Sequence, residues 1–217
     1  MQLRLPLVHR GNRLVAVVFG GALVIALYLL PSRLELRPAI TLDRSFIDDW
    51  VPFLGWTIWV YLSEYPLMVL AIWLGTDDRE RSRLFYAFIL AAVIALAIFI
   101  LWPTAVARES PGSDGVTGLL WRWLYSVDTP ANALPSLHVA NTCLAATCLR
   151  RCGRAWQIVA PIWAALIVLS TLTTKQHYAI DIAGGVALAA FSYVAVRACV
   201  RFRDVAATPR FRNSPMP

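Results

Sequence analysis

The sequence predicts an all-α integral membrane protein, a bundle of six spanning helices in a single domain over residues 1–217. Hydrophobic residues make up 59% of the chain and charged residues 15%, whereas soluble domains are about half apolar and about a quarter charged. The hydrophobic residues are concentrated in long runs, which is typical of membrane spans. Six such runs use up most of the chain, so we expect no separate soluble domain.

The runs follow one another with mostly short connections. A spanning helix needs about 20 residues at ~1.5 Å rise each, and the fourth run is shorter than this. Proline cannot continue a helix, so the first span is expected to stop at Pro31 and the third at Pro103. The tail over 204–217 is predicted to be disordered. The six predicted spans cover residues 14–30, 51–74, 84–102, 135–149, 156–172 and 180–200.

The basic residues predict the orientation of the bundle. Most of the 20 Lys and Arg lie in the N-terminal segment, the loops after the second and fourth spans, and the C-terminal tail. The positive-inside rule places these segments in the cytoplasm. Both termini are then cytoplasmic, and the loops 31–50, 103–135 and 173–179 face outward from the cell (inner or plasma) membrane. The arginines form no single basic face, so no nucleic-acid partner is expected.

Two loop segments have a composition of their own. The stretch 118–125 mixes aromatic residues with one arginine, which favours a short helix in the membrane interface. The acidic run 77–80 is interpreted as a solvated cytoplasmic loop, far from the candidate site described next.

His138 stands at the outer end of the fourth span. Pro135 suits the first turn of a helix, where its missing N–H costs nothing. The free N–H groups of such a turn form an anion site, to which Ser136 adds a hydroxyl. Taken alone, His138 is better explained as a structural histidine that caps a helix end.

His177 stands at the outer end of the sixth span, four residues before Asp181. On a helix this spacing puts both side chains on one face, where the carboxylate fixes the imidazole tautomer and supports its positive charge. An ionisable residue at the start of an apolar span is a functional candidate. The alternative for Asp181 is a helix N-cap, and the two roles are compatible.

Two cations accompany the histidines in the outer loops. Lys175, the only lysine of the chain, and Arg108 are candidates to hold phosphate oxygens, or else charges that anchor span ends. These parts suit the cleavage of a phosphate ester, with His177 as nucleophile and His138 as acid and then base. Arg108, Lys175 and Ser136 would bind the phosphate, with neither metal nor cofactor.

The segments around both histidines resemble the motifs of one family. Residues 135–138 resemble the PSxH motif of the type 2 phosphatidic acid phosphatase (PAP2) superfamily, and 170–181 resemble its SR-x5-H-x3-D motif. The resemblance covers most of the chain and implies a six-helix membrane bundle. It also implies a phosphohistidine on His177, acid–base catalysis by His138, and Asp181 as the partner carboxylate.

The sequence departs from this pattern in three places. The first motif of the family, KxxxxxxRP, is absent, and residues 102–108 instead resemble a segment of the branch with inositol phosphorylceramide synthases and sphingomyelin synthases. Leu137 stands where many phosphatases have glycine. Thr171 stands where the third motif has arginine, and Lys175 is the proposed substitute.

Three functions fit this reading. The first is a lipid-phosphate phosphatase, whose partners are a lipid phosphate substrate and the membrane lipids. The second is a phosphotransferase that passes a phospho-head group to an alcohol. The third is a transporter or scaffold that keeps the fold without catalysis. Glu64, within the second span, is either a contact for the head group or acceptor, or a structural partner for a buried polar group. The sequence predicts no oligomeric state.

Overall fold

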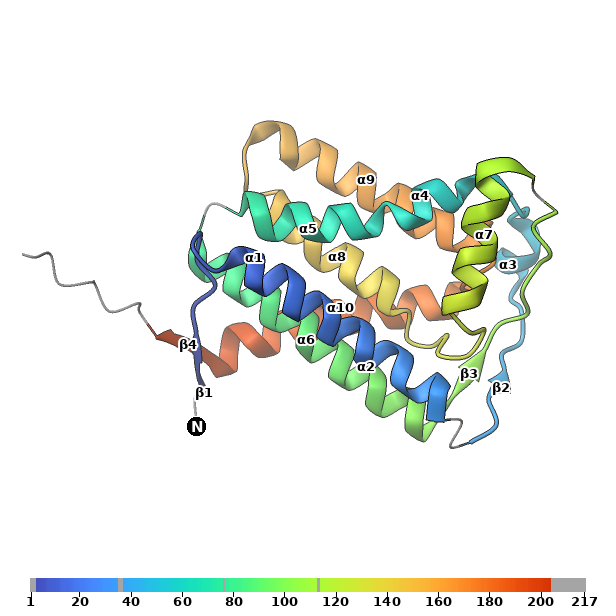
Figure 1. The fold of residues 1–217 in the computed structure, drawn as a ribbon, viewed down its shortest axis with the longest axis horizontal. Helices are drawn as coiled ribbons and strands as arrows, with labels where there is room; N and C mark the ends of the chain where they lie inside the picture. The colour runs from blue at the N-terminus through green and yellow to red at the C-terminus, as the bar shows by residue number, and fades with distance from the viewer. Residues whose placement is uncertain (1–2, 35–36, 76, 113, 204–217) are drawn as a thin grey trace, which may run out of the picture.

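The computed structural model of this chain is predominantly helical (Figure 1). It describes residues 3–34, 37–75, 77–112 and 114–203, so the prediction of a disordered tail over 204–217 lies outside the described residues. Its helices are α1 (Arg13–Val15), η1 (Ala16–Gly20), α2 (Gly21–Leu34), α3 (Phe46–Trp50), η2 (Gly55–Thr57), α4 (Ile58–Leu62), α5 (Glu64–Leu74), α6 (Asp78–Leu101), α7 (Gly115–Val127), α8 (Leu137–Leu149), α9 (Arg154–Thr173) and α10 (Ala179–Cys199). Its strands are β1 (Leu3–Pro6), β2 (Ile40–Thr41), β3 (Thr104–Ala105) and β4 (Val200–Arg203).

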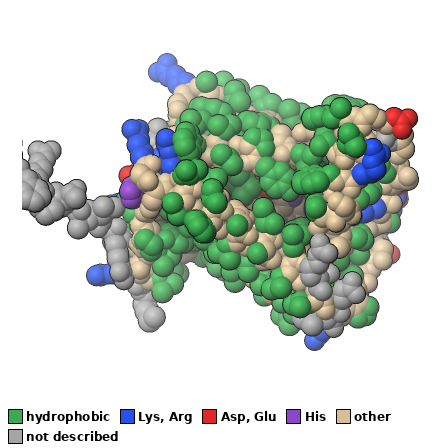
Figure 2. Space-filling view, viewed as in Figure 1, with side chains coloured by type: hydrophobic (Ala, Val, Ile, Leu, Met, Phe, Trp, Pro, Cys, Tyr) green, Lys and Arg blue, Asp and Glu red, His purple; other side chains and the backbone are tan. Residues whose placement is uncertain are grey.

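Within the described residues, five helical segments are long and apolar enough to cross a membrane. Their outward faces carry large exposed hydrophobic side chains such as Phe19, Ile158 and Val194, as expected where the surroundings are lipid. Figure 2 shows hydrophobic side chains over the middle of one face, with Lys and Arg toward the two ends. The five segments are Arg13–Pro31, Gly55–Leu74, Asp78–Leu101, Arg154–Thr173 and Ala179–Cys199.

Helix α8 is the exception, because its 13 residues are too few to cross a ~30 Å hydrocarbon core. It packs against α5, α6, α9 and α10, and most of its residues are buried. Figure 1 shows α8 in the interior of the bundle. A helix enclosed by other helices need not reach both membrane surfaces, and its N-terminus can lie inside the bundle.

Several helix boundaries differ from those the sequence predicts, and the first two spans differ most clearly. Helix α2 continues past Pro31 to Leu34, since a proline this close to the end of a helix removes little of its hydrogen bonding. The second predicted span begins at Gly55 rather than at 51 and breaks at Ser63, between α4 and α5. The break places Glu64 in the first turn of α5.

The two ends of the described chain meet at one end of the bundle. Strands β1 and β4 pair in parallel, with Leu3 opposite Val200. The acidic run 77–80 lies at the α5–α6 turn, and the prediction of a loop is wrong there, because Asp77 caps α6 and residues 78–80 form its first turn; Asp77 and Arg79 are exposed. There the half-buried Glu80 accepts a hydrogen bond from the Tyr193 hydroxyl at 2.8 Å.

The opposite end of the bundle is covered by the long connections. The stretch predicted to form a short helix does so as α7, which lies across the ends of the spanning helices with α3 and the β2–β3 pair (Figure 1). The N-termini of α8 and α10 open at this end. Both predicted site histidines are therefore beneath these covering segments.

Candidate active site

The first turn of α8 places His138 at the wall of a pocket. Ser136 is the N-cap of the helix, and its hydroxyl accepts a hydrogen bond from the Val139 N–H at 3.2 Å. Because α8 begins at Leu137, Pro135 precedes the cap rather than forming the first turn. The fully buried Ser136 side chain thus acts as a helix cap and lines neither described pocket.

Two side chains of the second span fix the imidazole of His138. Its Nδ1 is in direct contact with Oε2 of Glu64, and both side chains are almost fully buried. The ring stacks on Tyr61 with 3.9 Å between centroids and 8° between planes. Nε2 of His138 has no hydrogen-bond partner among the described residues. The nitrogen that lacks a partner is therefore the one available to a ligand.

His177 occupies the tight turn between α9 and α10. Its N–H donates to the carbonyl of Thr171 at 3.2 Å, which fixes the turn at the end of α9. Its Nδ1 lies 3.5 Å from Oδ2 of Asp181, in the first turn of α10. The same carboxylate accepts a 2.8 Å hydrogen bond from the Tyr178 N–H, so Asp181 caps its helix as well as facing the imidazole.

A close helix crossing brings the two histidine-bearing turns together. The Ser136 N–H donates to the carbonyl of Asp181 at 3.1 Å. A Cβ atom added at Gly185 would lie 2.5 Å from the Ser136 carbonyl oxygen and 2.8 Å from the Cβ of Val139. Only glycine permits this approach between α8 and α10, because any side chain would push the two helices apart.

Arg108 reaches the site from the loop after α6. Its guanidinium donates to Oδ2 of Asp128 at 2.8 Å and to the Asp128 carbonyl at 2.9 Å, and lies 4.6 Å over the Tyr125 ring. Asp128 also accepts from the Tyr28 hydroxyl at 2.7 Å. Burial raises the pKa of Asp128, and Arg108 only partly offsets this effect. Arg108 is thus in place for an anion but already holds one carboxylate.

The ammonium group of Lys175 is bound by the loop before the second span. Its ammonium group donates to the backbone carbonyls of Asp48, at 2.6 Å, and of Val51. Burial, together with the nearby Arg44, lowers the pKa of Lys175. The backbone φ of 53° at Lys175 lies in the left-handed region, which is uncommon for a residue with a side chain. Lys175 therefore ties the loop before the second span to the turn that carries His177.

Asp48 strengthens this connection between the loop before the second span and the turn that carries His177. Its carboxylate accepts hydrogen bonds from the Ser45 N–H at 2.8 Å and hydroxyl at 2.6 Å, and from the Ala179 N–H at 2.8 Å. Burial raises the pKa of Asp48, but these hydrogen bonds and Lys175 outweigh it and hold the pKa below its ordinary value. The outer loop is thereby fastened to the start of α10.

His138 and His177 line one pocket of about 550 Å³. Glu64, Asp128 and Tyr61 line the same polar end, and the remainder of the wall is almost entirely apolar. A small adjoining pocket reaches Arg108 and shares His177, Asp128 and Tyr61 with the larger one. The arrangement presents two imidazoles, each beside a carboxylate, to a space that is otherwise suited to hydrocarbon.

Sequence reasoning missed several residues of this site. It singled out Glu64 but not its contact with His138, which depends on the break at Ser63. Asp128 and Tyr61 were not identified at all, because nothing in their local sequence distinguishes them from loop and span residues. Asn141, one helical turn after His138, also lines the pocket with a buried Oδ1 that has no described partner.

Comparison with known proteins gives one match. The sequence fits the model of the PAP2 superfamily over residues 25–195, which is most of the chain and includes both histidine motifs. No curated protein and no solved structure matches it.

Proposed function

The chain belongs to the PAP2 superfamily, whose members are generally phosphoric ester hydrolases or phosphotransferases, and on that premise we propose that it is a membrane lipid-phosphate phosphatase. The observation that carries this proposal is the pocket in which two imidazoles, each with its own carboxylate, end an apolar cavity. The proposed enzyme works through a phosphohistidine and without a metal ion.

In the first half-reaction, Nε2 of His177 attacks the phosphorus of the substrate. Asp181 lies 3.5 Å from Nδ1 of the same ring, close enough for its negative charge to stabilise the positive charge that forms on the ring. As the nitrogen–phosphorus bond forms, the ester oxygen–phosphorus bond breaks. Nε2 of protonated His138 delivers its proton to the departing alkoxide.

In the second half-reaction, neutral His138 acts as the base. It removes a proton from water, whose oxygen attacks phosphorus as the bond to His177 breaks. Phosphate is released and both rings return to their starting protonation states. Glu64, in contact with Nδ1 of His138, supports the imidazolium in each cycle.

Arg108 is the proposed ligand of the phosphate oxygens, since its planar guanidinium suits two of them and it borders the histidine end of the pocket. The contacts of Lys175 and Ser136 give both residues structural tasks instead. Asp48 and Lys175 are proposed as positioning residues, because they hold the turn that carries His177.

A charge imbalance favours a second candidate function, the transfer of a phospho-head group to an alcohol. Arg108 is the one Lys or Arg among the described residues that line either pocket, and it is paired with Asp128. A phosphate monoester carries up to two negative charges and would meet a site rich in carboxylates. A phosphodiester carries one and is better matched, which fits the resemblance to the inositol phosphorylceramide synthase branch.

The proposed orientation follows from the positive-inside rule together with the fold. The segments richest in arginine, including β1 and β4, lie at the end of the bundle opposite the histidines. We infer six spans with α8 as the short, enclosed one, both termini in the cytoplasm, and a site that faces outward from the cell membrane.

The deciding experiment is turnover by the purified protein in lipid nanodiscs. Lipid phosphate monoesters and phospholipid diesters are supplied with and without alcohol acceptors, and both phosphate and lipid products are measured. Free phosphate without alcohol supports the phosphatase, and product that depends on alcohol supports the transferase. His138→Ala and His177→Ala should abolish either activity. His9→Ala, in the loop between β1 and α1, should not. Full function of both variants in cells would instead indicate a transporter or scaffold.

A further inference from the structure

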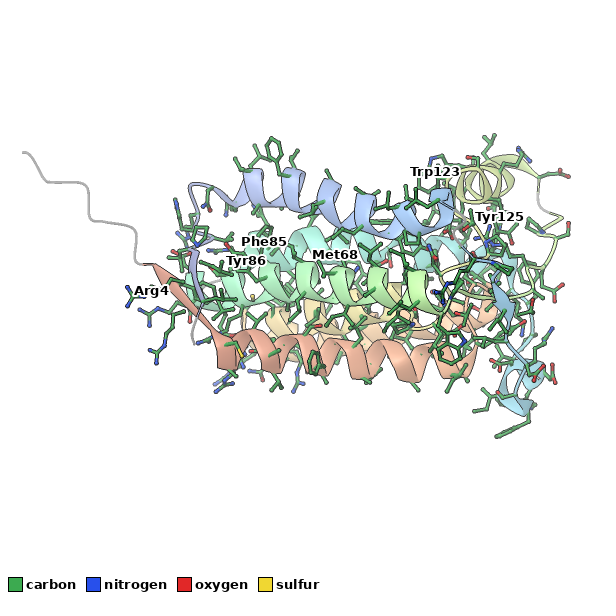
Figure 3. The ribbon with its side chains drawn as sticks, turned by 90° about the horizontal axis from the view of Figure 1, so that it is seen from below. Arg4, Met68, Phe85, Tyr86, Trp123 and Tyr125 are labelled. Carbon is green, nitrogen blue, oxygen red and sulfur yellow. The ribbon has the colours of Figure 1, made fainter. Side chains whose placement is uncertain are left out.

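The pocket continues far beyond the histidines, between α2, α5 and α6. Tyr28 lines its polar end and Ala16 its other end, on one continuous helical segment. Twelve residues at ~1.5 Å each correspond to about 18 Å of length. Half of a hydrocarbon core is about 15 Å thick, so the pocket is deeper than one leaflet. In Figure 3, Trp123 marks the histidine end, Met68 the middle and Phe85 the far end.

The far end of the pocket is shaped by two glycines and one aromatic ring. A Cβ atom added at Gly20 would lie 2.3 Å from the ring of Phe85, so the ring packs directly against the glycine backbone. A Cβ atom added at Gly21 would meet no atom within 4 Å, although Gly21 lines the pocket. Phe85 therefore forms part of the wall at the far end, while the missing side chain at Gly21 leaves the space in front of it open.

We propose that this far end measures the hydrocarbon chain of the lipid substrate, with Gly21 and Phe85 setting the longest chain that fits. The inference rests on the proposed function, since the phosphate at the histidines fixes where the chain begins. The occupant is one long hydrocarbon chain, because the wall beyond the histidine end is apolar and belongs to the same pocket as the two histidines.

Steric fit, rather than burial, supplies the selectivity. The chain comes from a bilayer that is as apolar as the pocket, so each methylene gains little by the transfer. A chain longer than the cavity must fold against Phe85 or push the helices apart, and overfilling a packed interior is strongly unfavourable. An added side chain at position 21 should therefore shorten the accepted length, and removal of the ring at position 85 should lengthen it.

The test is a competition in nanodiscs between lipid substrates that share a head group and differ in chain length. Product ratios, measured by mass spectrometry, give the selectivity of each variant. Gly21→Leu should shift the selectivity toward shorter chains, and Phe85→Ala toward longer chains, each by about tenfold. The controls are Ala22→Leu and Phe191→Ala, which make the same kinds of change at exposed positions outside the pocket.

A binding measurement separates this inference from the proposed function. Non-hydrolysable lipid phosphonates of the same chain lengths are bound to His177→Ala protein, alone and combined with each pocket variant, and affinities are measured by native mass spectrometry. Shifted length profiles support the chain measurement even if no lipid is turned over. Identical profiles in all variants would overturn it even if the enzyme is active. Each substitution has its own predicted direction. If one variant fails to fold, the shift in the other variant still tests the inference.

Discussion

The contact between Glu64 and His138 yields the sharpest prediction of the mechanism. Glu64→Gln keeps the size of the side chain and removes its charge. Both groups are almost fully buried, so solvent screens their interaction little. The stacked Tyr61 should hold the ring in place in the variant. The substitution therefore isolates the electrostatic support of the imidazolium from the position of the ring.

The size of the effect follows from the kind of bond that is lost. A hydrogen bond to a charged group contributes about 1.5–3 kcal/mol of stabilisation. If this support is needed in the transition state, kcat/KM should fall roughly tenfold to a hundredfold, since ~1.36 kcal/mol corresponds to a factor of ten. A loss of this size is well short of the abolition expected for His177→Ala.

The assay compares two leaving groups on otherwise similar lipid phosphates. An alkyl ester needs a proton from His138 as the alkoxide departs, whereas an activated aryl ester leaves without one. Because kcat/KM reports the first irreversible step, Glu64→Gln should reduce it for the alkyl ester and leave it nearly unchanged for the aryl ester. His177→Ala should eliminate both activities, as the nucleophile is needed in each.

An equal loss for both esters would refute this reasoning. It would mean that Glu64 supports the fold or the nucleophile rather than the proton transfer by His138. Unchanged kinetics for both esters would equally refute it, since a buried charge in contact with the acid would then have no part in the reaction. Thermal unfolding of the variant serves as the control for a general loss of structure.

Four further predictions concern the surroundings of the histidines. Lys175→Met should lower the melting temperature while raising KM much less than Arg108→Met does, because its ammonium group binds backbone carbonyls. Hydrogen bonds hold the pKa of Asp48 below its ordinary 3.8. The stabilisation of the fold by the Asp48 carboxylate is therefore present above pH 3.8 and lost as the pH falls through the folded pKa. On acidification, the melting temperature of the wild type should show a decline from this source that Asp48→Asn lacks. Asp128→Asn should free Arg108 and raise the ratio of kcat/KM for monoesters to that for diesters. Gly185→Ala should abolish activity and destabilise the bundle by roughly 1–3 kcal/mol or more, whereas Gly21→Ala should unfold like the wild type.

The parts of this fold that follow a simple physical rule could be predicted from the sequence. Long apolar runs identify spanning helices because lipid offers the backbone no hydrogen bonds. The spacing of His177 and Asp181 predicts that the two side chains lie close, and they are 3.5 Å apart, although His177 stands in the turn before α10 and not on the helix itself. Both depend on nearby residues only, and local patterns carry that information.

The remaining features depend on contacts between segments far apart in the chain. Lys175 has the charge of a phosphate ligand, but its ammonium group is held by carbonyls more than 120 residues earlier in the chain. The partnership of Asp128 with Arg108 likewise depends on how two loops fold over the bundle. A pattern of residue types states which groups are available, and only the packing of the helices decides which of them meet.

The positions at which helices begin connect these observations with the chemistry. Glu64, His138 and Asp181 each lie in the first turn of a helix, in α5, α8 and α10. A first turn has N–H groups without partners in the helix and the positive end of the helix dipole, which favour negative charge nearby. An apolar bundle can therefore hold two buried carboxylates and bind an anion with few cations. Because α8 is short and enclosed, its first turn opens inside the bundle and at the end of the hydrocarbon pocket. For the proposed function, the depth at which these helices begin sets the point along the lipid substrate at which its ester bond meets the histidines.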